Sequence, residues 1–379
     1  MTRSAPLRLV RGSDPELPEA LRQALAGGRP LAVLPDDDTA AARAVAVLRP
    51  EQPVDADVAV VVATSGSTGE PKAVVLPVGA VRAAVAASED RLGRAASWTS
   101  VLAPSAVGGL MVLARAVLTR AVLRRRSADL ADPALAPEGD GPHLLSVVPT
   151  QLHRVRDDPA ALARLARFEA VLVGGAAVDP GLLDDLRAAG VRPVTTYGLS
   201  ETCGGCVYDG VPLRGVEVVA DADQRLRITT PTAFAGYLHR PDLTAEVLVG
   251  PRTVLTSDRG RLDDGRLSVL GRLDDVVVTG GINVDLAQLE RQLRAVLGPV
   301  EVAVTARPDP EWGTRIVAVL EEGSPFELDA LQQRLRALVA DAALPRELLR
   351  LPSLPRLPGG KVDRMELRRL AADVAGARR

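Results

Sequence analysis

Residues 58–76 read VAVVVATSGSTGEPKAVVL and are the most informative stretch of the chain for its fold. Both ends of this stretch are runs of small and β-branched apolar residues, which are typical of buried strands. The loop between them is rich in glycine and hydroxyl side chains. Glycines let backbone N–H groups converge on an anion, hydroxyls add donors, and lysine supplies a point charge. The sequence therefore predicts a polyphosphate-binding loop made of Thr64, Ser65, Gly66, Ser67, Thr68, Gly69 and Lys72.

This loop does not follow the Walker A pattern. The spacing of Gly66, Gly69 and Lys72 differs from GxxxxGK[ST], and Ala73 stands where a serine or threonine would bind magnesium. The chain is therefore not predicted to be a P-loop NTPase.

Lysine occurs only at positions 72 and 361 among the 46 basic residues of the chain. A strong preference for arginine would replace any lysine that is needed only as a cation. Arginine is a planar fork and cannot imitate a compact ammonium group. Lys72 and Lys361 are therefore candidate catalytic residues.

Outward from the loop, short β-rich runs alternate with helical stretches over roughly the first 270 residues, an α/β pattern. The remaining residues, about a hundred, show the pattern of a small α+β domain. We expect two domains, at 1–273 and 274–379. The expected helices are 14–26, 39–48, 285–297, 327–340 and 362–374, and the expected strands are 31–34, 58–63, 73–76, 144–148, 170–173, 191–195, 300–305 and 315–320.

Composition narrows the possible partners. The formal charge is −2 with a pI near 6.1, so no basic excess is available for nucleic acid. The N-terminus lacks a long apolar core and the apolar run 107–123 is interrupted by Arg115 and Arg120, which predicts a cytoplasmic protein without membrane insertion. The sequence does not indicate an oligomeric state.

Cys203 and Cys206 have the C-x-x-C spacing of a redox pair or of half a zinc site. One pair cannot complete a four-ligand site, and His143, His153 and His239 are scattered along the chain. The sequence therefore predicts no metal cage.

The phosphate loop resembles the T-S-G-S-T-G-x-P-K motif of the adenylate-forming superfamily, which contains acyl-CoA synthetases, adenylation domains and luciferases. The run Thr196-Tyr197-Gly198-Leu199-Ser200-Glu201-Thr202 resembles the family's Y-G-x-[ST]-E motif. The resemblance implies that Tyr197 stacks on adenine, Glu201 holds Mg²⁺ and Thr202 touches phosphate. These roles suit an aromatic face and a hard carboxylate oxygen. Gly174-Gly175-Ala176 is similar to the adenine-side loop.

Further motifs follow in the family's order. Asp258 in Thr-Ser-Asp and Arg272 resemble the pair that binds the ribose hydroxyls, although Ser257 replaces the usual glycine. Asp274 matches the hinge of a mobile small domain, and Gly280-Gly281 match the loop lining the pantetheine tunnel. Lys361 lies in a segment resembling P-x-x-x-G-K-[VIL], which carries the lysine of adenylation. The resemblance implies the adenylate-forming fold, with ATP, Mg²⁺ and CoA as cofactor and cosubstrates and a small carboxylic acid as substrate.

Three segments are most similar to the o-succinylbenzoyl-CoA synthetase branch, namely 146–152, 171–177 and 201–210. In that branch the run of small residues that corresponds to Cys203-Gly-Gly-Cys206 lies beside the acyl pocket, which implies a structural role for both cysteines. One departure is the segment 103–110, where small residues replace the usual aromatic wall. The resemblance implies an acyl pocket formed by Gln151, Arg154, Ser105, Gly108, Gly204 and Val207, with Arg154 facing a second carboxylate.

The implied function is ATP-dependent activation of o-succinylbenzoate to an acyl-AMP, followed by thioester formation with CoA in menaquinone biosynthesis. Alternatives are a CoA ligase for another aryl acid and a stand-alone adenylation enzyme that loads a carrier protein. A nucleotide-binding protein without turnover is disfavoured because Lys361 and Glu201 are both present.

Overall fold

A computed structural model describes residues 4–55, 57–65, 71–298, 300–356 and 362–377 of the 379-residue chain. The chain forms two compact units. Unit 1 comprises residues 1–219, 227–256 and 262–267, and unit 2 comprises residues 220–226, 257–261 and 268–379. The predicted boundary between residues 273 and 274 remains a prediction. Within the described residues, no helix has the length and apolarity that crossing a membrane requires.

The first large sheet of unit 1 has seven strands in the order β13-β12-β11-β10-β9-β7-β8. Strands β11, β10, β9, β7 and β8 run parallel, while β12 and β13 pair antiparallel at one edge. Its strands are β7 (Ser97–Ser100), β8 (Val122–Arg125), β9 (His143–Val147), β10 (Ala170–Gly174), β11 (Pro193–Leu199), β12 (Gly204–Tyr208) and β13 (Val211–Pro212).

The second large sheet of unit 1 has the order β16-β6-β5-β3-β2. Its strands are β2 (Arg8–Arg11), β3 (Leu31–Leu34), β5 (Val58–Ser65), β6 (Pro71–Pro77) and β16 (Gly236–Tyr237). Strands β5 and β6 form an antiparallel pair in which Thr64 lies opposite Lys72. The predicted phosphate loop is therefore the connection of a hairpin. A small pair, β1 (Ser4–Ala5) with β4 (Val54–Asp55), lies outside both sheets.

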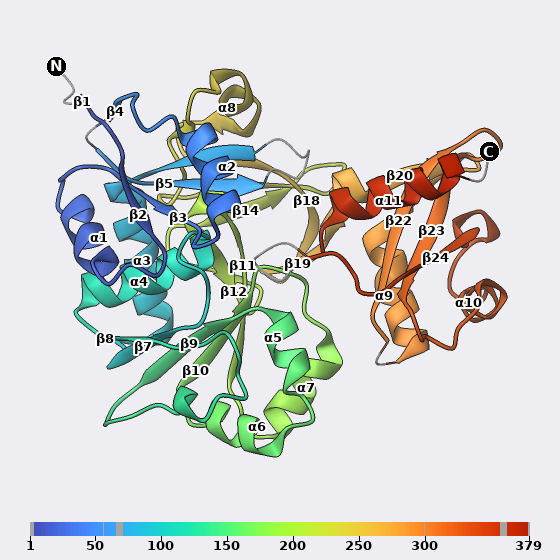
Figure 1. The fold of residues 1–379 in the computed structure, drawn as a ribbon, viewed down its shortest axis with the longest axis horizontal. Coiled ribbons are helices and arrows are strands. Elements are labelled where there is room, and N and C mark those ends of the chain that lie inside the picture. Colours follow the sequence, from blue (N-terminus) through green and yellow to red (C-terminus); the bar gives the residue numbers. More distant parts are fainter. Residues whose placement is uncertain (1–3, 56, 66–70, 299, 357–361, 378–379) are drawn as a thin grey trace. The chain divides into compact units, whose positions relative to one another are not determined.

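Helices cover both sheets and share their cores (Figure 1). Helices α1, α3 and α4 pack against β3, β5 and β6, and α3 and α4 also contact the seven-stranded sheet, so they form a layer between the sheets. Helix α2 covers the other face of the sheet that contains β3, β5 and β6, and α5, α6 and α7 cover the other face of the seven-stranded sheet. Their bounds are α1 (Leu17–Leu25), α2 (Asp38–Leu48), α3 (Val78–Leu92), α4 (Val107–Thr119), α5 (Pro149–Arg154), α6 (Pro159–Leu165), α7 (Pro180–Ala188) and α8 (Pro241–Val247).

A third sheet has the order β14-β15-β18-β17, with β19 paired to β18. Its strands are β14 (Glu217–Ala220), β15 (Arg225–Thr229), β17 (Leu248–Gly250), β18 (Thr253–Asp263) and β19 (Arg266–Arg272). Single 3-10 turns occur at Pro133–Leu135, Ser200–Thr202, Leu273–Asp275 and Asp341–Ala343.

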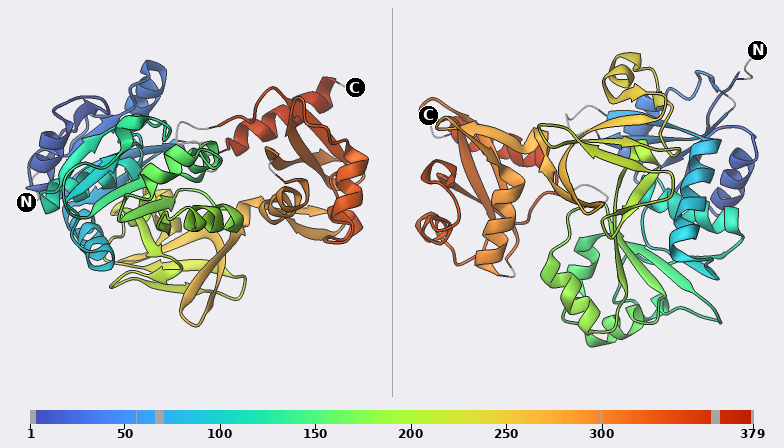
Figure 2. Two further views of the ribbon diagram at one scale, coloured as in Figure 1. Left: turned by 90° about the horizontal axis from the view of Figure 1, so that it is seen from below. Right: turned by 180° about the vertical axis from the view of Figure 1, so that it is seen from behind.

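Unit 2 is built on a three-stranded sheet in the order β22-β23-β24. These strands are orange to red in Figure 2. Alternate residues of β22 and β23 pack on helices α9 and α10, and the intervening residues pack on α11, as the two-residue period of a strand requires. A hairpin of β20 and β21 precedes α9. The bounds are β20 (Val276–Thr279), β21 (Ile282–Asp285), α9 (Leu286–Leu297), β22 (Val302–Asp309), β23 (Gly313–Glu321), α10 (Leu328–Leu335), β24 (Glu347–Leu351) and α11 (Arg364–Ala377).

Several expected elements differ from the structure at their ends. The expected helix 14–26 begins three residues later, at Leu17, while the expected strand 31–34 coincides with β3. The expected strand 191–195 instead spans Pro193–Leu199, because its last residues pair with β12. The expected helix 327–340 ends at Leu335, whose side chain is the last of the helix to be fully buried.

Candidate active site

Most predicted site residues of unit 1 gather at one edge of the seven-stranded sheet. Because β7, β9, β10 and β11 are parallel, their carboxyl ends share that edge, which is where open α/β sheets bind ligands. The predicted residues there are Ser105 and Gly108 after β7, Gln151 and Arg154 in α5 after β9, Gly174, Gly175 and Ala176 at the end of β10, and Thr196, Tyr197, Gly198 and Glu201 in or after β11.

The end of β10 packs tightly on β11. A Cβ atom on Gly174 would lie 2.1 Å from Oγ1 of Thr196, and Gly175 has a φ of 84°. Only glycine fits both conditions without strain. The close packing at Gly174 and the positive φ of Gly175 explain the two glycines of this predicted adenine-side loop.

The predicted phosphate loop is only partly described. Thr64 donates a 3.3 Å hydrogen bond from Oγ1 to the carbonyl oxygen of Lys72, which joins the two strands just before the loop. Gly66, Ser67, Thr68 and Gly69 lie outside the described residues, as does Lys361, and so does the side chain of Ser65.

Glu201 lies beside a residue that the sequence analysis did not identify. The hydroxyl of Tyr237 donates a 2.6 Å hydrogen bond to Oε1 of Glu201. Burial raises the pKa of Tyr237, and the neighbouring carboxylate raises it further, so the hydroxyl stays protonated and can donate. Nζ of Lys72 lies 5.1 Å from the centre of the same ring. Glu201 and Lys72, predicted from separate motifs, are therefore close neighbours of one tyrosine.

Thr202 caps the turn after β11. Its Oγ1 accepts a 2.9 Å hydrogen bond from the Leu199 amide and donates a 2.8 Å bond to the carbonyl oxygen of Gly204. These contacts hold the turn that carries Glu201. The contact predicted between Thr202 and phosphate remains a prediction.

The two cysteines are free and buried on either side of Gly204-Gly205. Burial raises the pKa of Cys206 to about 11 and that of Cys203 further. Both groups are therefore thiols, not thiolates, at neutral pH. Within the described residues, no three or more His, Cys, Asp or Glu side chains form a group that could hold a metal ion.

Two of the three segments predicted to line the acyl pocket lie against each other. A Cβ atom on Gly204 would lie 3.6 Å from Met111 and 3.9 Å from Val107, both in α4. Val207 is buried and pairs with Tyr197 across β12 and β11. The structure thus places Gly204 beside the helix that contains Gly108.

The two predicted substrate residues of α5 differ in their surroundings. The amide oxygen of Gln151 accepts a bond from the Val148 backbone, and its nitrogen donates to the carbonyl oxygen of Ala128, at 3.0 and 2.9 Å. Gln151 is buried, whereas Arg154 is exposed and has no ion pair with any carboxylate in the part of the chain that the structure describes.

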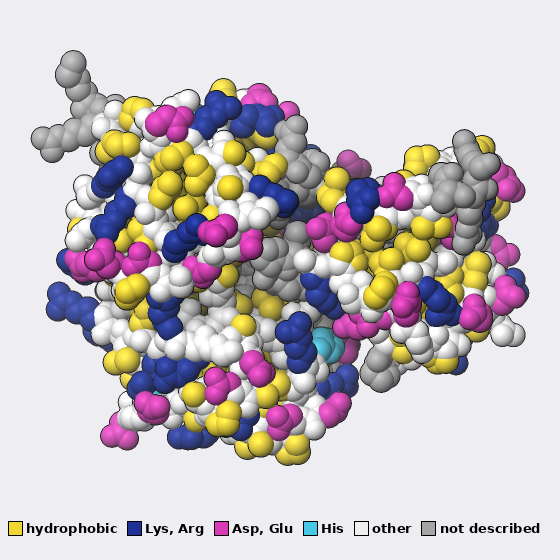
Figure 3. Space-filling model, in the orientation of Figure 1, with side chains coloured by type: hydrophobic (Ala, Val, Ile, Leu, Met, Phe, Trp, Pro, Cys, Tyr) yellow, Lys and Arg dark blue, Asp and Glu magenta, His cyan; other side chains and the backbone are white. Residues whose placement is uncertain are grey.

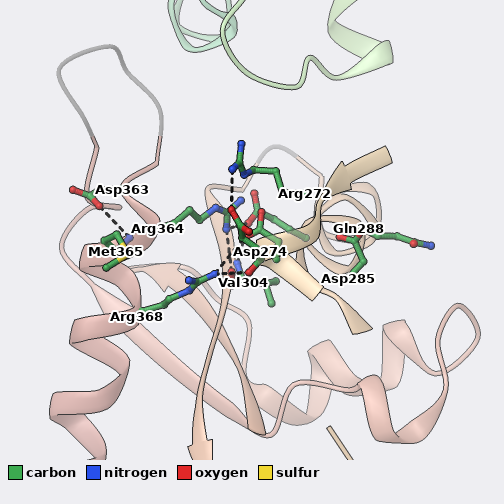
Figure 4. A network of polar contacts seen from close by, with 11 residues as sticks. Arg272, Asp274, Asp285, Gln288, Val304, Asp363, Arg364, Met365 and Arg368 are labelled. Atoms are coloured by element: carbon green, nitrogen blue, oxygen red, sulfur yellow. Dashed lines mark hydrogen bonds and ion pairs between the residues drawn. The ribbon is translucent and has the colours of Figure 1, made fainter. Parts of the chain in front are cut away.

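Unit 2 contains the predicted ribose pair. Arg272 forms an ion pair with Asp258 at 3.2 Å. It forms a second ion pair, at 2.8 Å, with the predicted hinge residue Asp274 (Figure 4). Asp258 is buried. Arg368 of α11 donates to the backbone carbonyl oxygen of Asp274 at 3.0 Å, which ties the 3-10 turn to the last helix.

The predicted tunnel residues form the two-residue turn of the β20–β21 hairpin. Gly280 and Gly281 have φ values of 54° and 81°, the conformation that favours glycine at both positions. A Cβ atom on Gly280 would lie 2.8 Å from the ring of Trp312, whereas one on Gly281 would have no heavy atom within 4 Å.

The donor set near Glu201 fits magnesium. Mg²⁺ prefers oxygen ligands, keeps several waters and is usually bound through one or two carboxylates together with substrate phosphates. Glu201 provides such a carboxylate, next to the hairpin that carries Lys72. A site of this kind needs no group of three protein ligands.

Comparison with known proteins identifies the family. Residues 10–236 match the model of the AMP-binding enzyme family. The chain belongs to that family. This AMP-binding enzyme is also 38% identical over 369 residues to a Mycobacterium tuberculosis protein named "probable 2-succinylbenzoate–CoA ligase", covering 94% of this chain and 95% of that protein. The superfamily predicted from the sequence motifs is confirmed, as is the prediction that the chain is an enzyme.

Solved structures show the same fold. Bacillus subtilis o-succinylbenzoate CoA synthetase bound to its acyl-adenylate intermediate matches this AMP-binding enzyme with a TM-score of 0.76 and 21% identity, over 95% of this chain and 87% of that one. The same Bacillus enzyme in complex with ATP and magnesium matches with a TM-score of 0.70 and 23% identity, over 82% and 70%. The predicted adenylate-forming α/β fold is confirmed.

Proposed function

We propose that this AMP-binding enzyme is a 2-succinylbenzoate–CoA ligase that uses Mg-ATP and CoA. The observation that carries the proposal is the 38% identity to the mycobacterial relative along almost the full length of both chains. The shared edge of β7, β9, β10 and β11 supports it, because this edge gathers the residues assigned to the acid and to adenine.

In the first half-reaction, the aliphatic carboxylate of the substrate attacks the α-phosphorus of ATP and pyrophosphate leaves. The protein has to align two anions and neutralise the charge that develops. We assign Lys361 to the carboxylate and α-phosphate, Lys72 to the β- and γ-phosphates, and Asp258 with Arg272 to the ribose. Glu201 would hold magnesium, which would supply positive charge at the phosphates.

In the second half-reaction, the thiol of CoA attacks the carbonyl carbon of the acyl-AMP and AMP leaves. We propose that the C-terminal domain, residues 274–379, rotates about Asp274 between the two steps. The rotation withdraws Lys361 and brings the Gly280-Gly281 turn to the pantetheine path. The turn suits this role because its glycines add no side chain to the path.

The substrate assignment is tested by pyrophosphate release with o-succinylbenzoate, benzoate, salicylate and short fatty acids, each with and without CoA. We expect CoA-dependent turnover of o-succinylbenzoate well above that of the monocarboxylates. Turnover of monocarboxylates alone would reject this substrate. Thioester formation on a carrier protein but not on free CoA would instead identify a carrier-loading enzyme.

A further inference from the structure

Tyr237 connects the two charged residues assigned to the phosphates. Its hydroxyl donates to Oε1 of Glu201 at 2.6 Å, and the centre of its ring lies 5.1 Å from Nζ of Lys72. The ring is buried, with 6% of the residue exposed. One rigid side chain therefore contacts both an anion and a cation of the candidate site.

Strand pairing explains how the ring reaches Lys72. Tyr237 in β16 lies opposite Val74 in β6, and Lys72 precedes Val74 by two residues on the same strand. Residues two apart on a strand share a face, and a diagonal neighbour across the pair is within reach of an aromatic ring. The ring edge also packs on Phe234, with ring centres 5.0 Å apart at 66°.

Backbone contacts fix the same segment on both sides. The Phe234 amide donates to the carbonyl oxygen of Glu201 at 2.9 Å. The Ala235 amide donates to Val75 of β6 at 2.9 Å, and the Leu238 amide donates to Ala73 of the same strand at 2.8 Å. Residues 234–238 therefore join the turn that carries Glu201 to the strand that carries Lys72.

We propose that Tyr237 is a positioning residue that fixes the Glu201 carboxylate for magnesium and holds the Lys72 side chain along the hairpin. The proposal rests on the proposed function, in which Glu201 and Lys72 bind Mg-ATP. A hydrogen bond to an ionised carboxylate is about twice as strong as one between neutral groups, so it restricts how the carboxylate can rotate. The ring face attracts the ammonium group by a cation–π interaction.

The first test separates the hydroxyl from the ring. Tyr237→Phe removes the hydroxyl and keeps the ring, whereas Tyr237→Leu removes both. Binding of α,β-methylene ATP, which cannot transfer its adenylyl group because the bridge between its α- and β-phosphorus atoms is not cleaved, is measured by calorimetry over a range of Mg²⁺ concentrations. We expect Tyr237→Phe to raise the Mg²⁺ concentration for half-maximal binding by about tenfold or more, as for loss of a partner that orients a metal ligand. Tyr237→Leu should also weaken binding at saturating Mg²⁺.

Tyr208→Phe is the matched control. The Tyr208 hydroxyl is bonded to the buried Arg115 of α4 at 3.1 Å, so this change also removes a hydroxyl from a buried tyrosine. The Mg²⁺ dependence of the control should equal that of the wild type. An equal shift in both variants would show a general loss of rigidity and would overturn the proposal.

A double mutant separates positioning from direct binding. If Tyr237 acts on magnesium through Glu201, Tyr237→Phe should add no further change in Mg²⁺ dependence to Glu201→Gln. The proposal would be overturned if Tyr237→Phe shifted the Mg²⁺ dependence as much in Glu201→Gln as in the wild type. It would also be overturned if the Tyr237→Phe single variant had the Mg²⁺ dependence of the wild type. These tests are interpretable when the wild-type enzyme binds the ATP analogue in the presence of Mg²⁺ and releases pyrophosphate from ATP in the presence of an acid. A wild type that does neither would instead reject the proposed function.

Discussion

A Cβ atom on Gly198 would lie 1.9 Å from the carbonyl oxygen of Gly204, in the neighbouring strand. Because that atom belongs to the backbone, Gly198→Ala has to move β11 away from β12. We expect the free energy of unfolding in urea to fall by about 1–3 kcal/mol, the usual cost of overpacking. Gly79→Ala is the control, since a Cβ atom there meets nothing within 4 Å and the position lies in helix α3. Equal stability of both variants would contradict the close approach.

Lys361→Ala should abolish acyl-AMP formation, because loss of a charge that stabilises the transition state costs on the order of a hundredfold to a thousandfold. Thioester formation from synthetic acyl-AMP and CoA should survive. Lys361→Arg should also form acyl-AMP slowly, since the planar guanidinium group of arginine cannot occupy the space of one ammonium group. Rates of the two half-reactions are measured separately. An equal loss of both in either variant would show that Lys361 has a different role.

Gly281→Phe should have the opposite effect to Lys361→Ala, with thioester formation impaired and acyl-AMP formation retained. A side chain at this turn would fill the pantetheine path and slow thioester formation, while acid-dependent pyrophosphate exchange stays near the wild-type rate. Gly281 is the better probe of the two glycines, because a side chain on Gly280 would first strike Trp312. Gly265→Phe is the control for backbone strain, since Gly265 also has a positive φ of 75° and open space around it. Thioester loss of the same size in the control would contradict the assignment.

Cys203 and Cys206 should react slowly with a disulfide reagent at pH 8. With a pKa of about 11, roughly one thiol in a thousand at Cys206 is ionised at that pH. Reaction should reach its full rate only after unfolding in urea. Rapid reaction of the native enzyme at pH 8 would contradict the buried, protonated state.

The same pKa shift predicts how stability depends on pH. A raised pKa in the folded state means that the folded thiol holds its proton while the unfolded thiol, near pKa 8.5, loses it. The contribution of Cys206 to stability is therefore complete below about pH 8.5 and is lost as the pH rises towards 11. The free energy of unfolding should fall more steeply over this window in the wild type than in Cys206→Ala.

Arg154→Ala should raise the KM for o-succinylbenzoate by about tenfold or more, the usual effect of losing a charged hydrogen bond. The KM for benzoate, which has no second carboxylate, should change little. Arg156→Ala is the control, because that arginine follows the same helix and is bonded at 2.6 Å to Asp185. Equal effects of the two variants on o-succinylbenzoate would remove Arg154 from the acyl pocket.

Local patterns in the sequence predicted the fold class and the two strands, β5 and β6, on either side of the phosphate loop. They failed where pairing with strands distant in the sequence decides where an element ends. The end of β11 is an example, because Tyr197 and Leu199 are held in the strand by pairing with Val207 and Gly204. In α10, the hydrophobic pattern continued past Leu335, but Leu338 beyond it is 48% exposed. Periodicity alone does not show which leucines reach a core.

Tyr237 was missed for the same reason. Its strand has only two residues, too few for a periodic signal, and its contacts with Glu201 and Lys72 depend on pairing with β6. One signal was available, since tyrosine occurs only three times in the chain. On the face shown in Figure 3, basic and acidic side chains are interspersed.

The distribution of site residues between two sheets has a consequence for changing what the enzyme accepts. Four of the residues assigned to the acid follow β7 and β9, namely Ser105, Gly108, Gln151 and Arg154, whereas Lys72, assigned to the β- and γ-phosphates, lies in the hairpin of the other sheet. Diversity introduced at Ser105, Gly108 and Arg154 leaves that hairpin and its strand pairing intact. A mutant library confined to those positions can therefore be screened for new acids by one assay, pyrophosphate release, because none of the changed positions lies in the hairpin that carries Lys72.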